Sequence, residues 1–234
     1  MALSPAQRHN QKIAVQKQLA RRQAVSSLDS LHVQIQALNQ DVEHLRTLPM
    51  ISDRIAHKRD VLLPKWMPTV MAYLESGSVF NHPVFAWYVV WLFDAGDLDK
   101  ALEMADIAIA QQQPTPDAIR STFPAFVADT VMAWAETTAA AGESIEPYFS
   151  RTFENIATRW RLHEEITAKW YKFAGLMLLR DDNGQPRATA VEDVETLEKA
   201  AVLLATAEKL YKKVGVGTMR ANIAARLRTL AKEQ

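Results

Sequence analysis

The most constraining feature of this sequence is an uninterrupted run of ten apolar residues, VFAWYVVWLF, at positions 84–93. A helix built from such a run is apolar on nearly every side, so it must be buried against other helices. A membrane-spanning helix needs about 20 apolar residues, and no run in the chain approaches that length. We therefore predict a core helix within residues 82–96 and no membrane partner.

The next segment, residues 97–113, is predicted to be the antiparallel partner of this core helix. Gly96 permits a tight turn between the two, and the apolar face of the second segment contains Leu98, Ala101, Leu102, Ala105, Ala108 and Ile109. This spacing resembles the second helix of a tetratricopeptide repeat, and it recurs later in the chain at Gly175, Ala200, Leu204 and Ala207. Stable repeat arrays usually need three or more stacked units. Two isolated units therefore indicate packed helix pairs rather than a peptide-binding groove.

The composition favours helices almost throughout. The 234 residues include only 7 Gly, Ala is abundant, and runs of β-branched residues are few. The length suits one medium domain or two small ones. The absence of Cys excludes disulfides, Cys-ligated zinc and thiol catalysis, and fits a reducing compartment. Because the formal net charge is zero, only local charge can indicate a nucleic-acid partner.

Changes of composition divide the chain into four parts. Residues 1–27 form a polar, basic arm without a continuous apolar segment of the kind found in secretory signals. Residues 28–63 are predicted to be a helical, heptad-containing segment, and residues 64–160 a central helical domain. Residues 161–234 are predicted to hold a C-terminal pair of helices with an exposed, turn-rich loop at 181–193. We therefore expect an all-α protein with an N-terminal arm and an antiparallel helical bundle.

A heptad seam marks the segment after the arm, and Pro49 ends it. Its apolar residues follow one another in steps of three and four: Leu28, Leu31, Ile35, Leu38, Val42 and Leu45. Such a seam predicts self-association through a coiled coil. An ordinary amphipathic helix within a hairpin of the same chain has the same pattern, so both interpretations stay open.

Two basic segments are candidates for nucleic-acid binding. In the arm, no acidic residue accompanies Arg8, Lys12, Lys17, Arg21 and Arg22. A second patch contains Arg54, Lys58 and Arg59. Such residues neutralise phosphates and release counterions, which gives salt-dependent binding with little sequence preference. The alternative for both segments is a solvated surface without a ligand.

Tryptophan is a possible base-stacking residue, and the chain has six. They lie on apolar helical faces or beside Pro rather than among basic residues. We therefore predict that they pack in the core, and Trp66, between Lys65 and Pro68, is the position where stacking on a base is the main alternative.

Several longer motifs together resemble one family. They are LLPKWMP (62–68), DAGDLDKALEMA (94–105), AAAGES (139–144) and KWYKFAGLMLLRDDNG (169–184), in this order after the basic arm and the heptad helix. The chain resembles the small terminase subunit of temperate contractile-tailed bacteriophages. The similarity extends from about residue 4 to the last helix.

The resemblance implies a role in genome packaging. A small terminase subunit is expected to assemble into rings, bind the packaging site on concatemeric double-stranded viral DNA, and recruit or stimulate a large ATPase subunit. It would act in the host bacterial cytoplasm and be absent from the mature virion. Helices from about residue 163 on are the candidate surface for the large subunit. In this family the subunit is often labelled an endonuclease.

The residues themselves give little support for catalysis by this chain alone. A metal-dependent nuclease needs converging carboxylates, and the acidic groups at Asp94, Asp97 and Asp99, at Asp181 and Asp182, and at Glu192, Asp193 and Glu195 all lie at helix ends or in loops. No P-loop, HExxH, GxSxG or GxGxxG motif is present, so we expect no catalytic residue, no metal and no cofactor. Two alternatives stay open: an adaptor that binds a protein without DNA, and a metal-dependent endonuclease.

Overall fold

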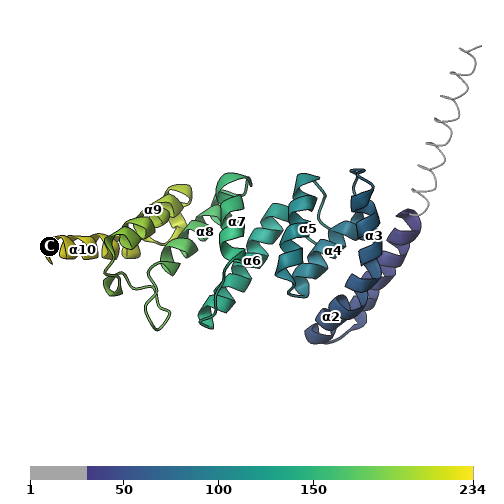
Figure 1. The fold of residues 1–234 in the computed structure, drawn as a ribbon, viewed down its shortest axis with the longest axis horizontal. Coiled ribbons are helices and arrows are strands. Elements are labelled where there is room, and N and C mark those ends of the chain that lie inside the picture. Colours follow the sequence, from purple (N-terminus) through teal and green to yellow (C-terminus); the bar gives the residue numbers. More distant parts are fainter. Residues whose placement is uncertain (1–30, 234) are drawn as a thin grey trace, which may run out of the picture. The chain divides into compact units, whose positions relative to one another are not determined.

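The computed structural model describes residues 31–233 (Figure 1). The arm residues Arg8, Lys12, Lys17, Arg21 and Arg22, and the first seam residue Leu28, lie outside the described residues. The described part is helical, and the only strand-like pairing in it is one isolated bridge between Arg180 and Pro186. The all-α prediction is therefore confirmed for residues 31–233. The chain divides into two compact units, Met1–Asp97 and Leu98–Gln234.

The described part of the first unit begins with a helix over residues 31–47. After a short turn it continues through α2 (Ile51–His57), a π-helical segment, η1 (Lys58–Leu62), and α3 (Leu63–Glu75). The last element of this unit is α4 (Pro83–Asp94).

Helices α2 and α3 join without a break, although Pro64 and Pro68 are of the residue type that usually ends or kinks a helix. Pro64 has no N–H to donate to the carbonyl four residues earlier. The π-helical segment accommodates this loss, because the amide of Leu63 donates to the carbonyl of Lys58, five residues earlier. Pro68 lies inside α3. The sequence signal for a break therefore produces a local change of helix type.

Helix α4 is the buried centre of the first unit, as its ten apolar residues predict. Every residue from Val84 to Phe93 except Trp87 is buried, and Trp91 is fully inaccessible. His82 caps the helix, because its Nδ1 accepts a hydrogen bond from the amide of Phe85 at 3.2 Å. Burial lowers the pKa of His82 to about 4.

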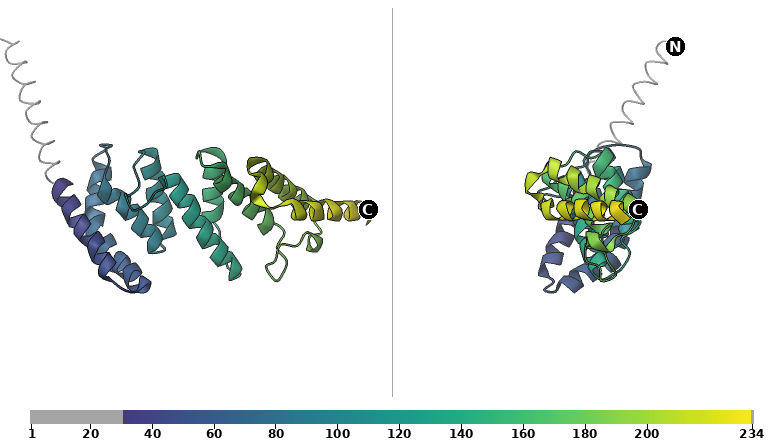
Figure 2. Two further views of the ribbon diagram at one scale, coloured as in Figure 1. Left: turned by 180° about the vertical axis from the view of Figure 1, so that it is seen from behind. Right: turned by 90° about the vertical axis from the view of Figure 1, so that its left-hand side faces the viewer.

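The second unit consists of six α-helices among its described residues: α5 (Leu98–Ala110), α6 (Phe123–Ala140), α7 (Tyr148–Thr158), α8 (Glu164–Met177), α9 (Val194–Leu210) and α10 (Gly217–Glu233). Two short 3₁₀ turns, η2 (Ala188–Ala190) and η3 (Lys212–Val214), lie before and after α9. Consecutive helices in this unit pack against each other. Helix α10 packs beside α9, and the loop that joins α8 to α9 projects away from these helices (Figure 2).

The α8–α9 contact is the most extensive in the second unit. A Cβ atom on Gly175 would lie only 2.9 Å from Cδ2 of Leu204 and 3.3 Å from the carbonyl oxygen of Ala200. Leu204, Ala200 and Ala207 are themselves fully buried. The small residues in the predicted second pair therefore allow close packing of two helices. The likeness to a tetratricopeptide unit stays a prediction.

Within residues 31–233, no helix combines the length and the apolarity that crossing a membrane requires.

Candidate nucleic-acid interface

A helical hairpin in the first unit carries the second predicted basic patch. The helix of residues 31–47 packs against the α2–α3 run, and Asp41 holds the two together. Its carboxylate accepts a hydrogen bond from Nζ of Lys65 at 2.6 Å and one from Nε1 of Trp66 at 2.8 Å. Trp66 is 4% exposed. Its side chain is therefore part of the core, as predicted, and it presents no face for base stacking.

The second predicted basic patch lies on this hairpin, and its three members differ in their surroundings. Lys58 is only 17% exposed, and its Nζ contacts Oδ2 of Asp94 at 2.6 Å. Arg59 is 60% exposed and forms two hydrogen bonds with the neighbouring Asp60. These bonds lower the pKa of Asp60, which is therefore charged at neutral pH.

Arg54 is the third member of this patch, and its Nε donates to the carbonyl of Leu48 at 2.7 Å. This contact joins α2 to the end of the preceding helix. Two of the three side chains, Arg54 and Lys58, therefore contribute to the hairpin itself. Arg59 is the most exposed of the three, with a carboxylate beside it.

Part of the heptad seam is buried inside this hairpin, where the helix of residues 31–47 meets the α2–α3 run. Leu38 is 1% exposed and Leu45 is 7% exposed, so both are covered within the chain. Leu31, Ile35 and Val42 are partly exposed. The hairpin thus uses part of the seam and leaves apolar surface at its other positions.

The acidic candidates in the first and second units mostly have structural partners. Asp94 binds Lys58, Oδ2 of Asp99 accepts from the hydroxyl of Tyr148 at 3.1 Å, and Asp193 caps α9 through Thr196. Across residues 31–233, no three His, Asp or Glu side chains come together in an arrangement suited to a metal ion.

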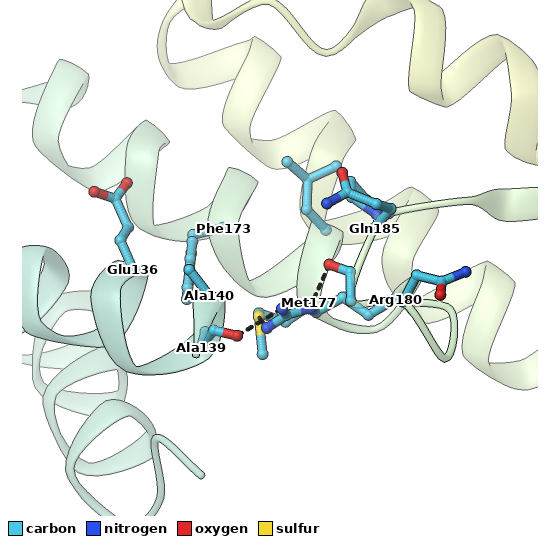
Figure 3. A pocket seen from close by; sticks show the side chains of 11 residues that line it. Glu136, Ala139, Ala140, Phe173, Met177, Arg180 and Gln185 are labelled. Atoms are coloured by element: carbon cyan, nitrogen blue, oxygen red, sulfur yellow. Dashed lines mark hydrogen bonds between the residues drawn. The ribbon is translucent and has the colours of Figure 1, made fainter. Parts of the chain in front are cut away.

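A cavity of about 280 Å³ lies in the second unit, between the end of α6, the outer side of α8 and the loop after α8 (Figure 3). Phe173, Met177 and Ala140 provide apolar walls, while Glu136 and Gln185 lie at its edges. The cavity therefore has an apolar interior and a polar margin.

Arg180 closes one side of this cavity. Its Nη2 donates to the carbonyl of Ala139 at 2.6 Å, and its Nε donates to the carbonyl of Gly184 at 2.8 Å (Figure 3). Ala139 lies in the last turn of α6, and its carbonyl also accepts a hydrogen bond from the amide of Gly142 at 3.0 Å. A single guanidinium therefore adds to the C-terminal cap of α6 and joins it to the loop beside it.

The predicted loop at 181–193 has its own internal order. The carboxylate of Asp181 accepts hydrogen bonds from the amides of Asn183 at 3.0 Å and Gln185 at 2.9 Å. The side chain of Arg187 lies 3.5 Å from the same carboxylate. Asp181 therefore organises a tight turn. In the sequence it was considered only as a possible metal-binding carboxylate.

One basic region was missed in the sequence. Residues 209–232 include seven Lys or Arg and no Asp or Glu: Lys209, Lys212, Lys213, Arg220, Arg226, Arg228 and Lys232. The signal is the same one that singled out the arm, which is an excess of one charge sign over a continuous segment.

Comparison with known proteins identifies the family. The sequence profile of the phage small terminase subunit matches residues 35–165. The chain belongs to the phage small terminase subunit family. The resemblance seen in the sequence motifs is thereby confirmed.

Two phage proteins are similar in sequence to most of this small terminase subunit. It is 43% identical over 196 residues to the "Probable terminase, endonuclease subunit" of Haemophilus phage HP1 (strain HP1c1), a match that covers 84% of this chain and 70% of the relative. It is 33% identical over 178 residues to the "Terminase, endonuclease subunit" of Escherichia phage P2, covering 75% of this chain and 71% of the relative. No solved structure matches it.

The family match in this small terminase subunit ends before the C-terminal helices. Residues 35–165 include the hairpin, the core helix α4 and α5 to α7. The arm and the basic segment 209–232 both lie outside the matched range.

Proposed function

We propose that this protein is a DNA-packaging subunit that binds double-stranded viral DNA as an oligomer and recruits or stimulates a large ATPase subunit. Membership of the small terminase subunit family is the observation that carries this proposal. The two relatives whose names describe them as terminase subunits support it.

The N-terminal arm is the proposed primary DNA contact. Its five basic residues, with no acidic residue among them, would neutralise phosphates and release counterions: Arg8, Lys12, Lys17, Arg21 and Arg22. On the hairpin, Arg59, the most exposed of the three, is the proposed additional contact, and Arg54 is better explained by its bond to Leu48. Lys58 is better explained as the partner of Asp94.

Self-association would strengthen this binding. We propose that the seam residues left partly exposed by the hairpin, Leu31, Ile35 and Val42, contact a second copy together with Leu28. Leu38 and Leu45 would support the same surface from within the hairpin. Several arms on one oligomer raise the effective concentration of each arm at the DNA, so weak contacts combine into stable binding.

The large ATPase subunit is proposed to contact the helices from about residue 163 on. This region contains the cavity beside Arg180, whose apolar interior offers buried surface to a partner. The ATP-dependent step would belong to that partner, since this sequence has no P-loop motif.

The test compares the full chain with a full-length variant in which the five arm residues are changed to Gln. Fluorescence anisotropy would measure binding to a duplex of about 40 base pairs from the packaging site, at several salt concentrations. We expect the variant to bind more weakly and to lose up to about 4 units from the slope of log K against log salt concentration. Sedimentation analysis of both proteins would report whether they are oligomers. A full chain that binds no DNA would contradict the proposal and favour an adaptor that binds only protein.

A second candidate function is cleavage of DNA by this chain, because both relatives are named endonuclease subunits. Incubation of the purified protein with supercoiled DNA and Mg²⁺ tests it directly. Nicked or linear DNA that disappears with EDTA would support cleavage. DNA that stays intact, in a preparation that binds it, would assign the cut to the large subunit.

A further inference from the structure

The end of α9, the turn η3 and helix α10 carry an excess of positive charge. Residues 209–232 contain seven basic and no acidic side chains, although the whole chain has 27 of each. Composition therefore does not explain the excess.

Two of these seven side chains have a structural role. Arg220 forms an ion pair with Glu208, and Nε of Arg226 donates to the carbonyl of Val191 at 3.0 Å. Both are half-buried and hold α10 against α9 and the preceding loop. Their charges are thus used within the fold.

The other five side chains have no such role. They are all exposed, and they form neither a hydrogen bond nor an ion pair with any residue that the structure describes: Lys209, Lys212, Lys213, Arg228 and Lys232. We call them the C-terminal basic surface. Nothing in the packing of the second unit requires five positive charges at these places.

The surface is long enough to follow a nucleic-acid backbone. Helix α10 has 17 residues, and at about 1.5 Å per residue it is about 25 Å long. Lys212 and Lys213 precede its first turn and Arg228 and Lys232 lie in its last turns, so the unpaired charges lie near both ends of the helix. Phosphates of one DNA strand follow one another by about 3.4 Å along the helix axis, so this length spans roughly seven of them.

Two of the three acidic residues of α9, Glu195 and Glu198, lie near its other end, and the third, Glu208, lies beside Lys209 and pairs with Arg220. Asp193 caps that helix and Glu195 pairs with Lys199 at 2.6 Å. Helix α9 also has 17 residues, so about 25 Å separates its acidic start from Lys209 at its end. Lys209 therefore has a carboxylate as its neighbour, whereas no acidic residue adjoins Lys212 and Lys213 in the sequence.

The chemistry of the surface favours DNA over a protein partner. Four of its five charged residues are Lys, which is depleted in protein–protein interfaces, where aromatic side chains, Met and Arg are enriched. The exposed positions of α10 between the charges are small or polar, including Ala221, Asn222, Ala224 and Ala225. No large exposed apolar side chain lies within 209–232, so the surface lacks the anchor that a protein interface needs.

We propose that the C-terminal basic surface binds the phosphate backbone of double-stranded DNA, as a second contact in addition to the arm. This inference rests on the proposed function, which supplies the DNA. Because the contact is to phosphates, it adds affinity without sequence preference.

A pair of matched variants of the full chain tests this surface. Lys212→Gln/Lys213→Gln removes two unpaired charges. Lys169→Gln/Lys199→Gln removes the same net charge from exposed lysines paired with Glu165 and Glu195. Anisotropy with a duplex of about 40 base pairs would be measured for both, for the wild type and for the arm variant, across a salt series.

We expect Lys212→Gln/Lys213→Gln to weaken binding about three- to tenfold near 0.1 M salt and to reduce the salt slope by about 1 to 2. The matched control should stay within about twofold of the wild type. The loss should be the same on a packaging-site duplex and on an unrelated duplex. Arg228→Gln/Lys232→Gln, on the same surface, should also weaken binding, but less.

The outcomes separate this inference from the proposed function. If the arm variant loses affinity and Lys212→Gln/Lys213→Gln does not, the C-terminal surface is not a DNA contact and the arm proposal stands. If the lysine variant keeps its DNA affinity and loses binding to the large subunit, the surface is a protein contact and this inference is overturned. If the wild-type chain binds neither duplex, the proposed function fails first.

Discussion

The carboxylate of Asp41 and the indole of Trp66, 25 residues apart in the sequence, form a 2.8 Å hydrogen bond. Asp41 is 16% exposed and also binds Nζ of Lys65, so one side chain satisfies a buried N–H and balances a charge. The contact joins the first described helix to α3, and it fixes which face of the heptad helix points inward.

Replacing Asp41 should therefore destabilise the hairpin. Asp41→Ala leaves the buried indole N–H without its acceptor, which costs about 1–3 kcal/mol. Asp41→Asn keeps an acceptor and should cost less. Urea unfolding followed by tryptophan fluorescence measures both. The control is Glu43→Ala, on the same helix, where an exposed pair with Arg46 should contribute no more than about 1 kcal/mol. Equal losses for Asp41→Ala and Glu43→Ala would contradict the role assigned to Asp41.

Gly175→Ala should destabilise the second unit, against the usual trend. In a helix interior, Ala is ordinarily better than Gly by about 0.5–1 kcal/mol. Here the new Cβ would lie 2.9 Å from Leu204, and overpacking of this kind costs about 1–3 kcal/mol.

A double-mutant cycle with Leu204→Ala tests the stated cause. Leu204→Ala alone should cost about 2–5 kcal/mol, and the two changes together should cost less than their sum, because the shortened side chain makes room for the new methyl group. Simple additivity would show that the clash with Leu204 is not the reason.

The stability of the first unit should depend on the protonation of His82. Its pKa in the folded state is about 4, below the ordinary value of about 6.5. The unfolded chain therefore binds more protons between these two values. Uncharged His82 therefore contributes to the free energy of unfolding. This contribution is fully present above about pH 6.5, and up to about 3 kcal/mol of it is lost as the pH falls toward 4.

Urea midpoints measured from pH 4.5 to 7.5 would reveal this dependence. His82→Asn retains an acceptor that can cap α4 and removes the titrating group, so its midpoint should vary less with pH. His32→Asn, at an exposed site, should keep the wild-type dependence. Parallel curves for wild type and His82→Asn would show that another group is responsible.

Loss of Arg180 should release the loop that follows α8. Arg180→Met removes the donors to Ala139 and Gly184, and hydrogen bonds from a charged group contribute about 1.5–3 kcal/mol. Hydrogen exchange should become faster in residues 181–187 and at the end of α6. Arg187→Met, at a side chain that is 63% exposed, should change exchange much less, and similar changes in both variants would refute the capping role.

Much of the helical order could be predicted because it depends on local pattern. The apolar run at 84–93, the small residues of α5 and Gly96, whose φ is 79°, mark α4, α5 and their turn correctly. Close packing at Gly175 was also foreseeable, because a Gly facing small residues on the next helix permits close approach.

The contacts that hold these helices together could not be predicted in the same way. Arg180 binds a carbonyl 41 residues away, at Ala139, and no local pattern specifies such a partner. The same holds for Asp41 and Trp66. Helix periodicity says which face is apolar, but it does not say which polar side chain on that face meets which group on another helix.

Two further differences have identifiable causes. Pro64 predicts a helix break, and the π-helical segment absorbs its missing donor instead. The basic segment 209–232 was visible in the sequence as a charge excess, but its meaning depends on knowing that Arg220 and Arg226 are engaged while Lys212 and Lys213 are not.

The π-helical segment Lys58–Leu62 has a consequence for how this region can change length. A π turn holds one residue more than an α turn over the same hydrogen-bonded span, and each residue of an α-helix advances by about 100° around its axis. Deleting one residue from 58–62 would therefore restore α geometry and keep α2 and α3 in nearly the same rotational phase. Arg54 and Trp66 would keep their contacts with Leu48 and Asp41, whereas deleting a residue from the α-helical part between them would turn one by about 100° relative to the other.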